Sequence, residues 1–254
     1  MNEGIFNLYK KQGETPLERI KRFQEGFPDY QDIPMTYAGR LDPMAEGVLL
    51  VLSGEHTKKK EEYLSLDKEY EVDVLVGVST DTGDVLGVVE EVSNVQESDE
   101  SLITEKTLSL VGTHEEPYPI FSSKPVNGKP LFEWARTAPL AQKDIPLHVV
   151  EIYAVDVISK KYVSLGELAD EIKNKIGSIK GDFRQEAILR KWESVMEDSG
   201  ENTVYLIRLN IRCGSGAYMR VVAQKLARSL GYPGLAYHIK RTRVGGYVIE
   251  ESEK

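Results

Sequence analysis

Cysteine is almost absent from the chain, since Cys213 is the only one among 254 residues. A single thiol cannot form an internal disulfide, and its rarity agrees with a reducing compartment. Long apolar runs are also missing, because no segment approaches the roughly 20 residues needed to cross a bilayer. The first residues, Met1–Gly4, lack the charged and apolar regions of a signal peptide. These absences predict a cytoplasmic protein that does not span a membrane.

Histidine is scarce as well, and its distribution argues against a metal centre. The four histidines are His56, His114, His148 and His238. They are scattered and have no thiolate or carboxylate neighbours at the spacing of a metal site. We therefore predict no metal, and we interpret Cys213 as a small buried core residue.

Positive charge is in short supply, with 32 basic against 41 acidic residues and a net charge of −9. Nucleic-acid-binding proteins usually show the opposite balance, because phosphate contacts dominate their affinity. The charges are unevenly distributed, however. The span 89–105 holds six acids and no base, and we expect a flexible loop there. The basic clusters are Lys58–Lys60; Lys124, Lys129 and Arg136; Arg220, Lys225 and Arg228; and Lys240, Arg241 and Arg243.

Hydrophobic periodicity predicts a mixture of helices and strands. Thr15 and Pro16 open an amphipathic helix over 16–25, and alternation places Tyr70 at the start of the apolar face of a strand over 70–78. Further strands are expected at 152–158 and 204–211, further helices at 164–176, 183–196 and 217–230. The helical segment at about 160–200 looks like an insertion between two strands. In the last helix, Arg220, Gln224 and Arg228 form a polar stripe.

The most informative segment is 36–54, which begins Thr-Tyr-Ala-Gly-Arg-Leu-Asp-Pro. It places one carboxylate, Asp42, between a Gly-Arg-Leu sequence and a proline, directly before an apolar run that is typical of a buried strand. An Asp-Pro turn that leads into a strand is common in α/β proteins. A carboxylate at the mouth of a buried strand is nevertheless held rigidly, and this makes Asp42 a candidate catalytic residue.

This segment resembles the Gly-x-Leu-Asp-Pro active-site loop of the TruB family of tRNA pseudouridine synthases. Four further stretches are similar to that family in the same order. They are Lys68–Val72 with the turn 77–87, the loop 117–136, the segment Cys213–Arg220 and the segment His238–Tyr247. Together they cover most of residues 4–247 except the insertion, and five ordered matches are much more specific than any one of them.

The resemblance implies which residues perform the reaction. Asp42 is the expected nucleophile, and Arg220 is the arginine that keeps it ionised and directed. Tyr70 is expected to stack on a uracil taken out of the base stack, with its phenol placed where the C5 proton leaves. The sequence leaves open whether Asp42 attacks C6 of the base or C1′ of the sugar. Such chemistry requires no cofactor, neither redox group nor metal.

RNA contacts are expected by the same resemblance. The candidate RNA-binding residues are Tyr37, Arg40, Leu41, Lys124, Lys129, Tyr218, Ile239, Lys240 and Arg241. Several positions depart from the family pattern. Tyr37 stands where a histidine is usual, Arg40 where a small residue is usual, and Glu46 where threonine or serine is usual. Lys124-Pro125 shifts the expected basic position by one, and Lys10-Lys11 replaces Lys-Pro. We expect these changes to alter substrate fit more than chemistry. The tetrapeptide Gly-Arg-Leu-Asp also resembles the RsuA family of ribosomal-RNA synthases.

The sequence thus predicts an α+β protein with the pseudouridine synthase fold, a central mixed and mostly antiparallel sheet flanked by helices. We expect one catalytic domain over 1–254, with the insertion at one sheet edge and no C-terminal PUA-type domain. The expected activity is isomerisation of uridine in tRNA, at uridine-55 of the T loop, by a monomer that does not bind membranes. The alternatives are an RsuA-like or other RNA target for the same chemistry, and a non-catalytic RNA-binding or RNA-folding protein.

Overall fold

The computed structural model describes residues 3–96, 100–138 and 140–254, and its secondary structure is mixed. The helices are α1 Pro16–Gly26, α2 Lys60–Leu64, α3 Glu100–Leu108, α4 Leu131–Thr137, α5 Ala169–Gly177, α6 Gln185–Ser199 and α7 Met219–Ser229. The strands are β1 Ile5–Lys10, β2 Met35–Ala38, β3 Ala45–Ser53, β4 Lys68–Val76, β5 Val78–Thr80, β6 Val89–Val92, β7 Gly112–Pro117, β8 Pro125–Val126, β9 Lys129–Pro130, β10 Leu147–Ser164, β11 Thr203–Cys213, β12 Gly234–Val244 and β13 Tyr247–Val248.

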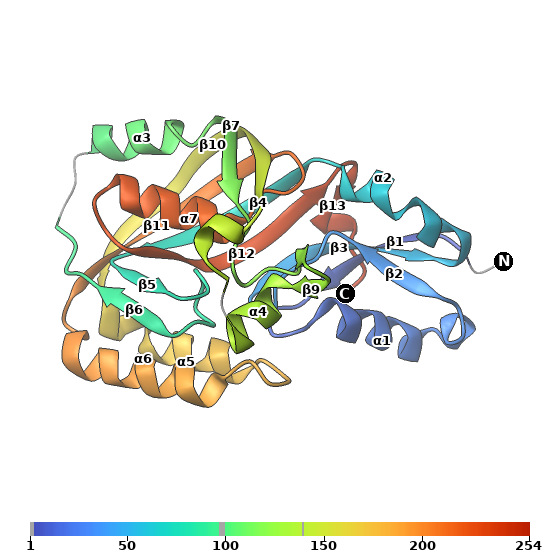
Figure 1. Ribbon diagram of the computed structural model, residues 1–254, viewed down its shortest axis with the longest axis horizontal. Coiled ribbons are helices and arrows are strands. Elements are labelled where there is room, and N and C mark those ends of the chain that lie inside the picture. The colour runs from blue at the N-terminus through green and yellow to red at the C-terminus, as the bar shows by residue number, and fades with distance from the viewer. Residues whose placement is uncertain (1–2, 97–99, 139) are drawn as a thin grey trace.

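One large sheet organises the chain (Figure 1). Its strands follow the order β1-β3-β12-β4-β11-β10-β7, with β2 and β13 pairing at β3 and β12. The pairing of β12 with β3 is parallel, and the other pairings in this sheet are antiparallel. The predicted α+β class and the mixed, mostly antiparallel sheet are therefore confirmed. The parallel pair places the start of β3, just after Asp42, beside Ile239 of β12.

The two faces of the central strands are covered by different helices. On one face Val72, Val74 and Val76 of β4 pack with Val222 and Leu226 of α7. This pattern confirms the predicted period-two alternation up to Val76. The predicted end at 78 was wrong, because Val78 begins β5 and belongs to the opposite apolar cluster.

The insertion covers the opposite face of the same strands. Leu75 of β4 belongs to a second apolar cluster with Ile172 of α5 and Trp192 of α6. Figure 1 shows α5 and α6 lying together below β5 and β6. The expectation that the insertion packs at a sheet edge was wrong, because its apolar stripe needs a broad face to bury it.

The N-terminal part forms a smaller core around β1 and β3. The predicted helix over 16–25 is α1, and its N-cap Thr15 forms a capping box with Glu18. Phe23 of α1 packs with Leu8 of β1 and Leu49 of β3. This core holds the strand that follows Asp42 against the rest of the molecule.

The acidic span 89–105 is more ordered than the sequence predicted. It contains β6 and the start of α3, while residues 97–99 lie outside the described part. Val89, Val95 and Ile103 are buried, and their burial outweighs the repulsion among the acids.

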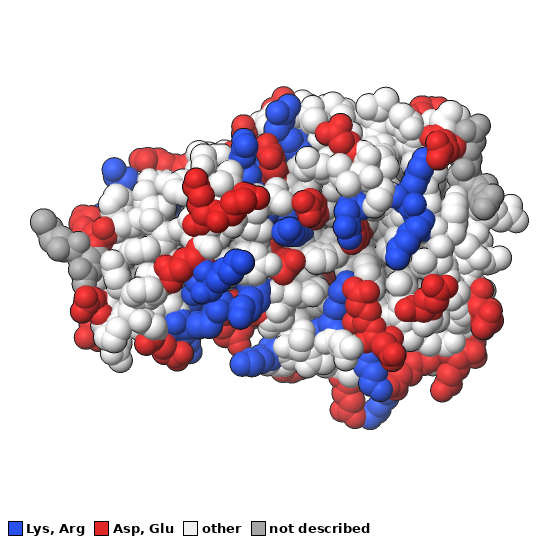
Figure 2. Space-filling view, turned by 180° about the vertical axis from the view of Figure 1, so that it is seen from behind, with Lys and Arg blue, Asp and Glu red and all other residues white. Residues whose placement is uncertain are grey.

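The face opposite to the view of Figure 1 shows acidic and basic side chains intermixed (Figure 2). None of the helices described is both long enough and apolar enough to cross a membrane.

Candidate active site

The loop 39–44 joins β2 to β3 and carries Asp42. Gly39 has φ of +81°, a conformation that favours glycine, and its carbonyl accepts a hydrogen bond from Arg241 Nη2 at 2.9 Å. At the other end, the Pro43 carbonyl accepts the N–H of Gly13 at 2.9 Å. The loop is thus fixed from both sides, as the position of Asp42 before a buried strand suggested.

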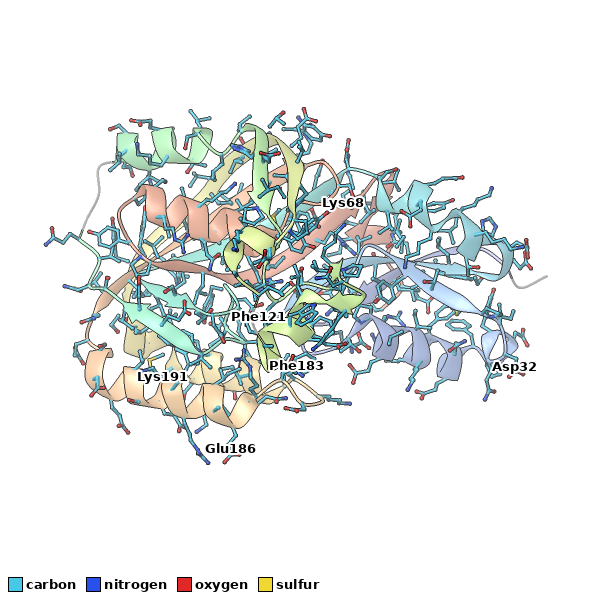
Figure 3. The ribbon with its side chains drawn as sticks, viewed as in Figure 1. Asp32, Lys68, Phe121, Phe183, Glu186 and Lys191 are labelled. Atoms are coloured by element: carbon cyan, nitrogen blue, oxygen red, sulfur yellow. The ribbon has the colours of Figure 1, made fainter. Side chains whose placement is uncertain are left out.

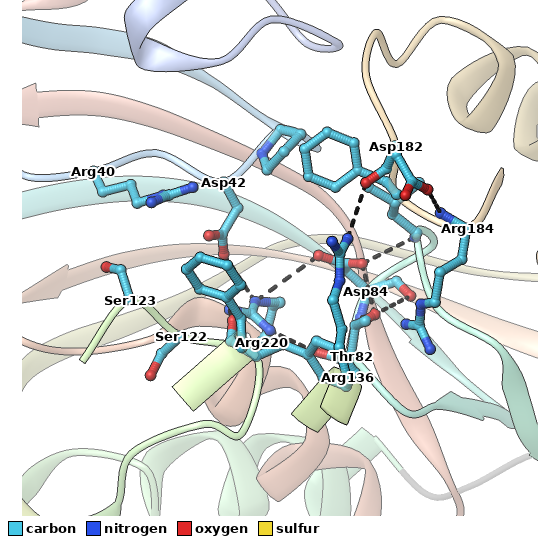
Figure 4. Close-up of a pocket in the computed structure, with 15 residues that line it drawn as sticks. Arg40, Asp42, Thr82, Asp84, Ser122, Ser123, Arg136, Asp182, Arg184 and Arg220 are labelled. Atoms are coloured by element: carbon cyan, nitrogen blue, oxygen red, sulfur yellow. Dashed lines mark hydrogen bonds and ion pairs between the residues drawn. The ribbon is translucent and has the colours of Figure 1, made fainter. Parts of the chain in front are cut away.

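Arg220, the second residue of α7, binds the Asp42 carboxylate. Its Nε donates to Asp42 Oδ2 at 2.9 Å, and its other nitrogens donate to the carbonyls of Thr82 at 2.6 Å and Phe121 at 3.0 Å. Burial lowers the pKa of Arg220, but Asp42 and Asp84 outweigh it and hold that pKa above its ordinary value. The Arg220 side chain is 4% exposed, whereas that of Asp42 is 30% exposed. The carboxylate is therefore held by a permanent cation and still reachable (Figure 4).

Asp84 is a second carboxylate beside Arg220, with its Oδ2 3.9 Å from Nε. It accepts hydrogen bonds from the Thr82 hydroxyl at 2.8 Å and the Leu86 N–H at 2.9 Å. Burial holds the pKa of Asp84 above its ordinary value despite the charge of Arg220. Sequence analysis did not select Asp84 as a site residue, although it lies in the turn 77–87 that carried one of the motif matches.

Asp42 opens into a cavity of about 250 Å³ that we call the Tyr70 cavity. Its lining includes Arg40, Leu41, Asp42, Lys68, Tyr70, Tyr218, Arg220, Ile239 and Arg241. Tyr70 is 8% exposed, and burial raises the pKa of its phenol above its ordinary value although Arg241 hydrogen-bonds to it. The phenol is therefore neutral near pH 7. Five of the nine predicted RNA-binding residues meet here with the predicted catalytic three.

Besides Arg220, two of the basic residues at this cavity are buried. Arg241 is 1% exposed and donates to the carbonyls of Val48 and Gly39, so it fixes the loop instead of presenting a free charge to phosphate. Lys68, which is labelled in Figure 3, donates to the carbonyls of Leu64 and Leu66. Burial lowers the pKa of the Lys68 amine to about 8. Sequence reasoning did not single out Lys68, although it lies in the Lys-x-Tyr match.

Aromatic rings and lysines form the rim of the site. Tyr118 stacks on His148 with the ring centroids 3.9 Å apart, and the Lys124 amine lies 4.8 Å from the Tyr118 ring centre. Tyr218 meets Tyr118 edge-on. The Lys129 amine lies 4.7 Å from the ring of Trp134. Flat rings beside half-buried cations, as here, are the kind of group that binds single-stranded nucleic acid.

Comparison with known proteins decides the family. The family model described as "TruB family pseudouridylate synthase (N terminal domain)" matches residues 33–181, which is more than half of the chain. This chain belongs to the TruB family. The curated tRNA pseudouridine synthase B of Limosilactobacillus reuteri is 29% identical over 98% of this chain and 70% of its own length. That of Psychrobacter cryohalolentis is 26% identical over 98% of this chain, which spans 58% of that relative.

Solved structures support the fold. A chain in the crystal structure of a Cbf5-Nop10-Gar1 complex matches 96% of this TruB-family chain with a TM-score of 0.56 and 16% identity. A chain in the structure of an H/ACA RNP bound to a substrate RNA containing 2′-deoxyuridine matches 96% with a TM-score of 0.55. This chain spans about half the length of either one. The pseudouridine synthase fold predicted from the motifs is therefore confirmed.

Four of the predicted RNA-binding residues do not line the Tyr70 cavity: Lys124 and Lys129, described above, and Tyr37 and Lys240. Tyr37 packs against the cluster around Phe23, with the Lys60 amine 5.6 Å from its ring centre. Lys240 pairs with Glu71 at 3.6 Å, and alternation along β4 puts Glu71 on the sheet face opposite to Tyr70. Neither side chain reaches the Tyr70 cavity, and an RNA contact by either one stays a prediction.

Glu46 also points away from the site of this TruB-family chain. It accepts a hydrogen bond from the Tyr9 hydroxyl at 2.6 Å, and its other oxygen lies 3.0 Å from His238 Nε2. The hydrogen bond from His238 is the main cause that lowers the pKa of Glu46. The side chain holds β1, β3 and β12 together, and an effect of Glu46 on substrate fit stays a prediction.

Lys10 is a buried anchor of the Asp42 loop that sequence analysis did not identify. Its amine donates to the carbonyls of Lys11 at 3.0 Å, Glu14 at 2.5 Å and Ala45 at 2.6 Å. We expect Lys10→Met to lower the free energy of unfolding by about 1–3 kcal/mol at pH 7, because three carbonyls lose their donor. Urea unfolding of the two proteins measures this difference.

The pH dependence gives a second test of Lys10. Burial lowers the pKa of its amine from 10.5 to about 8. The unfolded chain therefore binds more protons between these values, and the Lys10 contribution makes the unfolding free energy rise with pH from about 8 to 10.5. The stability difference between wild type and Lys10→Met should widen in this window. An equal difference at pH 7 and pH 9.5 would contradict the shifted pKa.

Proposed function

We propose that this protein converts uridine to pseudouridine in tRNA, at uridine-55 of the T loop. The observation that carries the proposal is the Asp42 carboxylate, which is held by Arg220 and opens into the Tyr70 cavity. The curated relatives named tRNA pseudouridine synthase B support tRNA as the substrate. The target position rests on the motif resemblance.

Pseudouridine is an isomer of uridine, so its formation needs no net oxidation and no second substrate. The N-glycosidic bond breaks, the uracil rotates, C5 joins C1′, and the C5 proton is lost while N1 gains one. Asp42 serves as the nucleophile that carries the separated fragment, whether it attacks at C6 or at C1′. Arg220 directs the carboxylate, and hydrogen bonds from Arg220 to two backbone carbonyls keep the arginine in place during the reaction.

Tyr70 is the proposed platform for the flipped uracil. Its ring lies in the wall of the cavity, and base stacking on an aromatic ring compensates for part of the unstacking energy. Its phenol is neutral near pH 7 because burial raises its pKa. It can therefore accept the C5 proton only as its own proton moves on, and the Asp42 carboxylate in the same cavity can receive that proton once its bond to the substrate has broken.

Because the net charge of the protein is negative, the proposed contacts with RNA phosphates are made by lysines at the rim of the site. We expect charge reversal of Lys124 and Lys129 to weaken tRNA binding and to reduce the salt slope of log Kd by about 2, one phosphate contact for each lysine. Binding titrations at several salt concentrations measure the slope. The matched control is Glu90→Gln with Glu91→Gln on β6, where both side chains are exposed. A larger change in the control than in the lysine variant would refute this location of the RNA.

The same chemistry on another RNA is the second candidate. Arg40 gives the Gly-Arg-Leu-Asp variant that resembles the RsuA family, and its exposed side chain lines the Tyr70 cavity. A protein that only binds or folds RNA has no need for a buried arginine paired with a reachable carboxylate. Tritium release from tRNA transcripts labelled at C5 of uridine tests the activity. Absence of release from tRNA, with release from ribosomal RNA fragments, would favour the second candidate.

A further inference from the structure

A second cavity of about 310 Å³ lies on the other side of Asp42. We call it the Phe183 cavity. It shares Arg40, Asp42 and Arg220 with the Tyr70 cavity, so the two are neighbours at the same carboxylate. Figure 4 shows Asp42 between Arg40 on one side and the group formed by Arg136, Asp182 and Arg184 on the other. An RNA strand with one nucleotide in the Tyr70 cavity would therefore pass directly by the Phe183 cavity.

Aromatic rings and arginines make up much of its lining. Phe121, Phe132 and Phe183 line the cavity, and Figure 3 shows Phe121 and Phe183 close together in the middle of the molecule. The Arg40 guanidinium lies 6.0 Å from the ring centre of Phe132. Arg40 and Arg136 are exposed, and no carboxylate within 3–96, 100–138 or 140–254 forms an ion pair with them. Flat apolar rings next to available guanidinium groups suit a nucleobase with its phosphate.

The insertion provides one wall of this cavity, through the loop between α5 and α6. Arg184 adopts φ of +65°, a conformation that side-chain-bearing residues rarely take. Its guanidinium pairs with Asp81 at 2.8 Å and lies 4.9 Å from the Phe121 ring centre. Arg136 donates to the Asp182 carbonyl at 2.9 Å. Residues in rare backbone conformations that are held by several contacts often lie at functional sites, and this makes the loop a candidate for substrate binding.

We propose that the Phe183 cavity binds the nucleotide next to the target uridine, with its base against Phe183 and its phosphate at Arg40 and Arg136. The inference rests on the proposed function, and it gives the insertion a role in choosing the substrate. The target base occupies the Tyr70 cavity and one flanking base occupies the Phe183 cavity. The preference for a particular RNA base beside the target uridine then depends on the loop between α5 and α6, which lies outside the motifs that resemble the family.

The test combines a change in the protein with a change in the RNA. Phe183→Leu removes the ring and keeps apolar bulk, while Phe183→Tyr keeps the ring. Arg190→Gln, on the exposed side of α6, is the control for the insertion surface, because Arg190 pairs only with Glu186 among the ion pairs described. Each protein is titrated with an unmodified tRNA transcript and with two versions that carry an abasic nucleotide immediately 5′ or 3′ of the target uridine. Pseudouridine at the target is measured in the same samples.

We expect one of the two abasic versions to bind wild type, Phe183→Tyr and Arg190→Gln about tenfold more weakly, because the stacked base is lost. The same version should bind Phe183→Leu less than about twofold more weakly than the unaltered transcript, since that variant has already lost the ring. An equal loss in Phe183→Leu and wild type, or no loss in wild type with either version, would overturn the inference. If wild type forms pseudouridine in either case, the proposed function stands and only the second site fails. If it forms none, the proposed function itself fails.

Discussion

Asp42→Asn should reduce single-turnover isomerisation of a tRNA transcript by at least about 10⁴-fold, because the substitution removes the proposed nucleophile. Binding of tRNA should change little, since asparagine keeps the shape of the side chain and Arg220 remains held by the carbonyls of Thr82 and Phe121. The measurement is the yield of pseudouridine over time at saturating enzyme, with the Kd determined by titration.

The matched control is Asp73→Asn. Asp73 also binds an arginine, with two hydrogen bonds from Arg208 at 2.6 and 2.9 Å, but it lines neither cavity at Asp42. The control should retain full activity. Activity of Asp42→Asn within tenfold of wild type would contradict the role of Asp42, and an equal loss in both variants would point to destabilisation instead.

Tyr70→Phe should bind tRNA nearly as well as wild type while turnover collapses. The ring that stacks on uracil is retained, and such stacking is worth about 1–3 kcal/mol. The phenol that assists removal of the C5 proton is lost. With tRNA that contains 5-fluorouridine, which has no C5 proton, the variant should still rearrange the substrate. Tritium release from 5-tritiated uridine, measured beside rearrangement of the fluorinated tRNA, separates the two steps.

Two other substitutions calibrate the Tyr70 result. Tyr70→Leu removes the ring as well and should be weaker in both binding and turnover. Tyr205→Phe removes the phenol of another buried tyrosine, one that stacks on Tyr162 with ring centroids 4.2 Å apart, and it should leave turnover unchanged. Wild-type tritium release by Tyr70→Phe would reduce Tyr70 to a packing residue.

Local sequence patterns predicted several of the helices and strands correctly. Period-two alternation identified the strand that begins near Tyr70, and Thr15 with Pro16 marked the start of α1. The acidic span was misjudged because three buried apolar residues decide its structure, and they are too few to produce a visible period. The face that the insertion covers was also hidden, since it depends on residues 75, 172 and 192 meeting in space.

In the candidate site, too, local motifs were predictable from the sequence, whereas contacts between distant residues were not. Asp42 and Arg220 are separated by 178 positions, so only the family resemblance placed them together before the structure did. Lys10 and Arg241 act through burial and bonds to distant backbone, for which the sequence has no local signal. Asp84 is important because it is buried beside Arg220, which also depends on a contact between distant parts of the chain. Tyr37 and Lys240 were predicted from the family resemblance, which did not reveal that Tyr37 packs against the Phe23 cluster and that Lys240 pairs with Glu71 outside the Tyr70 cavity.

The most direct test of the central claim is to map pseudouridine after the wild-type protein is incubated with unmodified tRNA transcripts. Carbodiimide adducts that survive alkaline treatment stop primer extension at each modified position. We predict one new stop, at uridine-55 of the T loop, which is absent when Asp42→Asn replaces the wild type. No stop in any tRNA at saturating enzyme, with tRNA binding intact, would contradict the account.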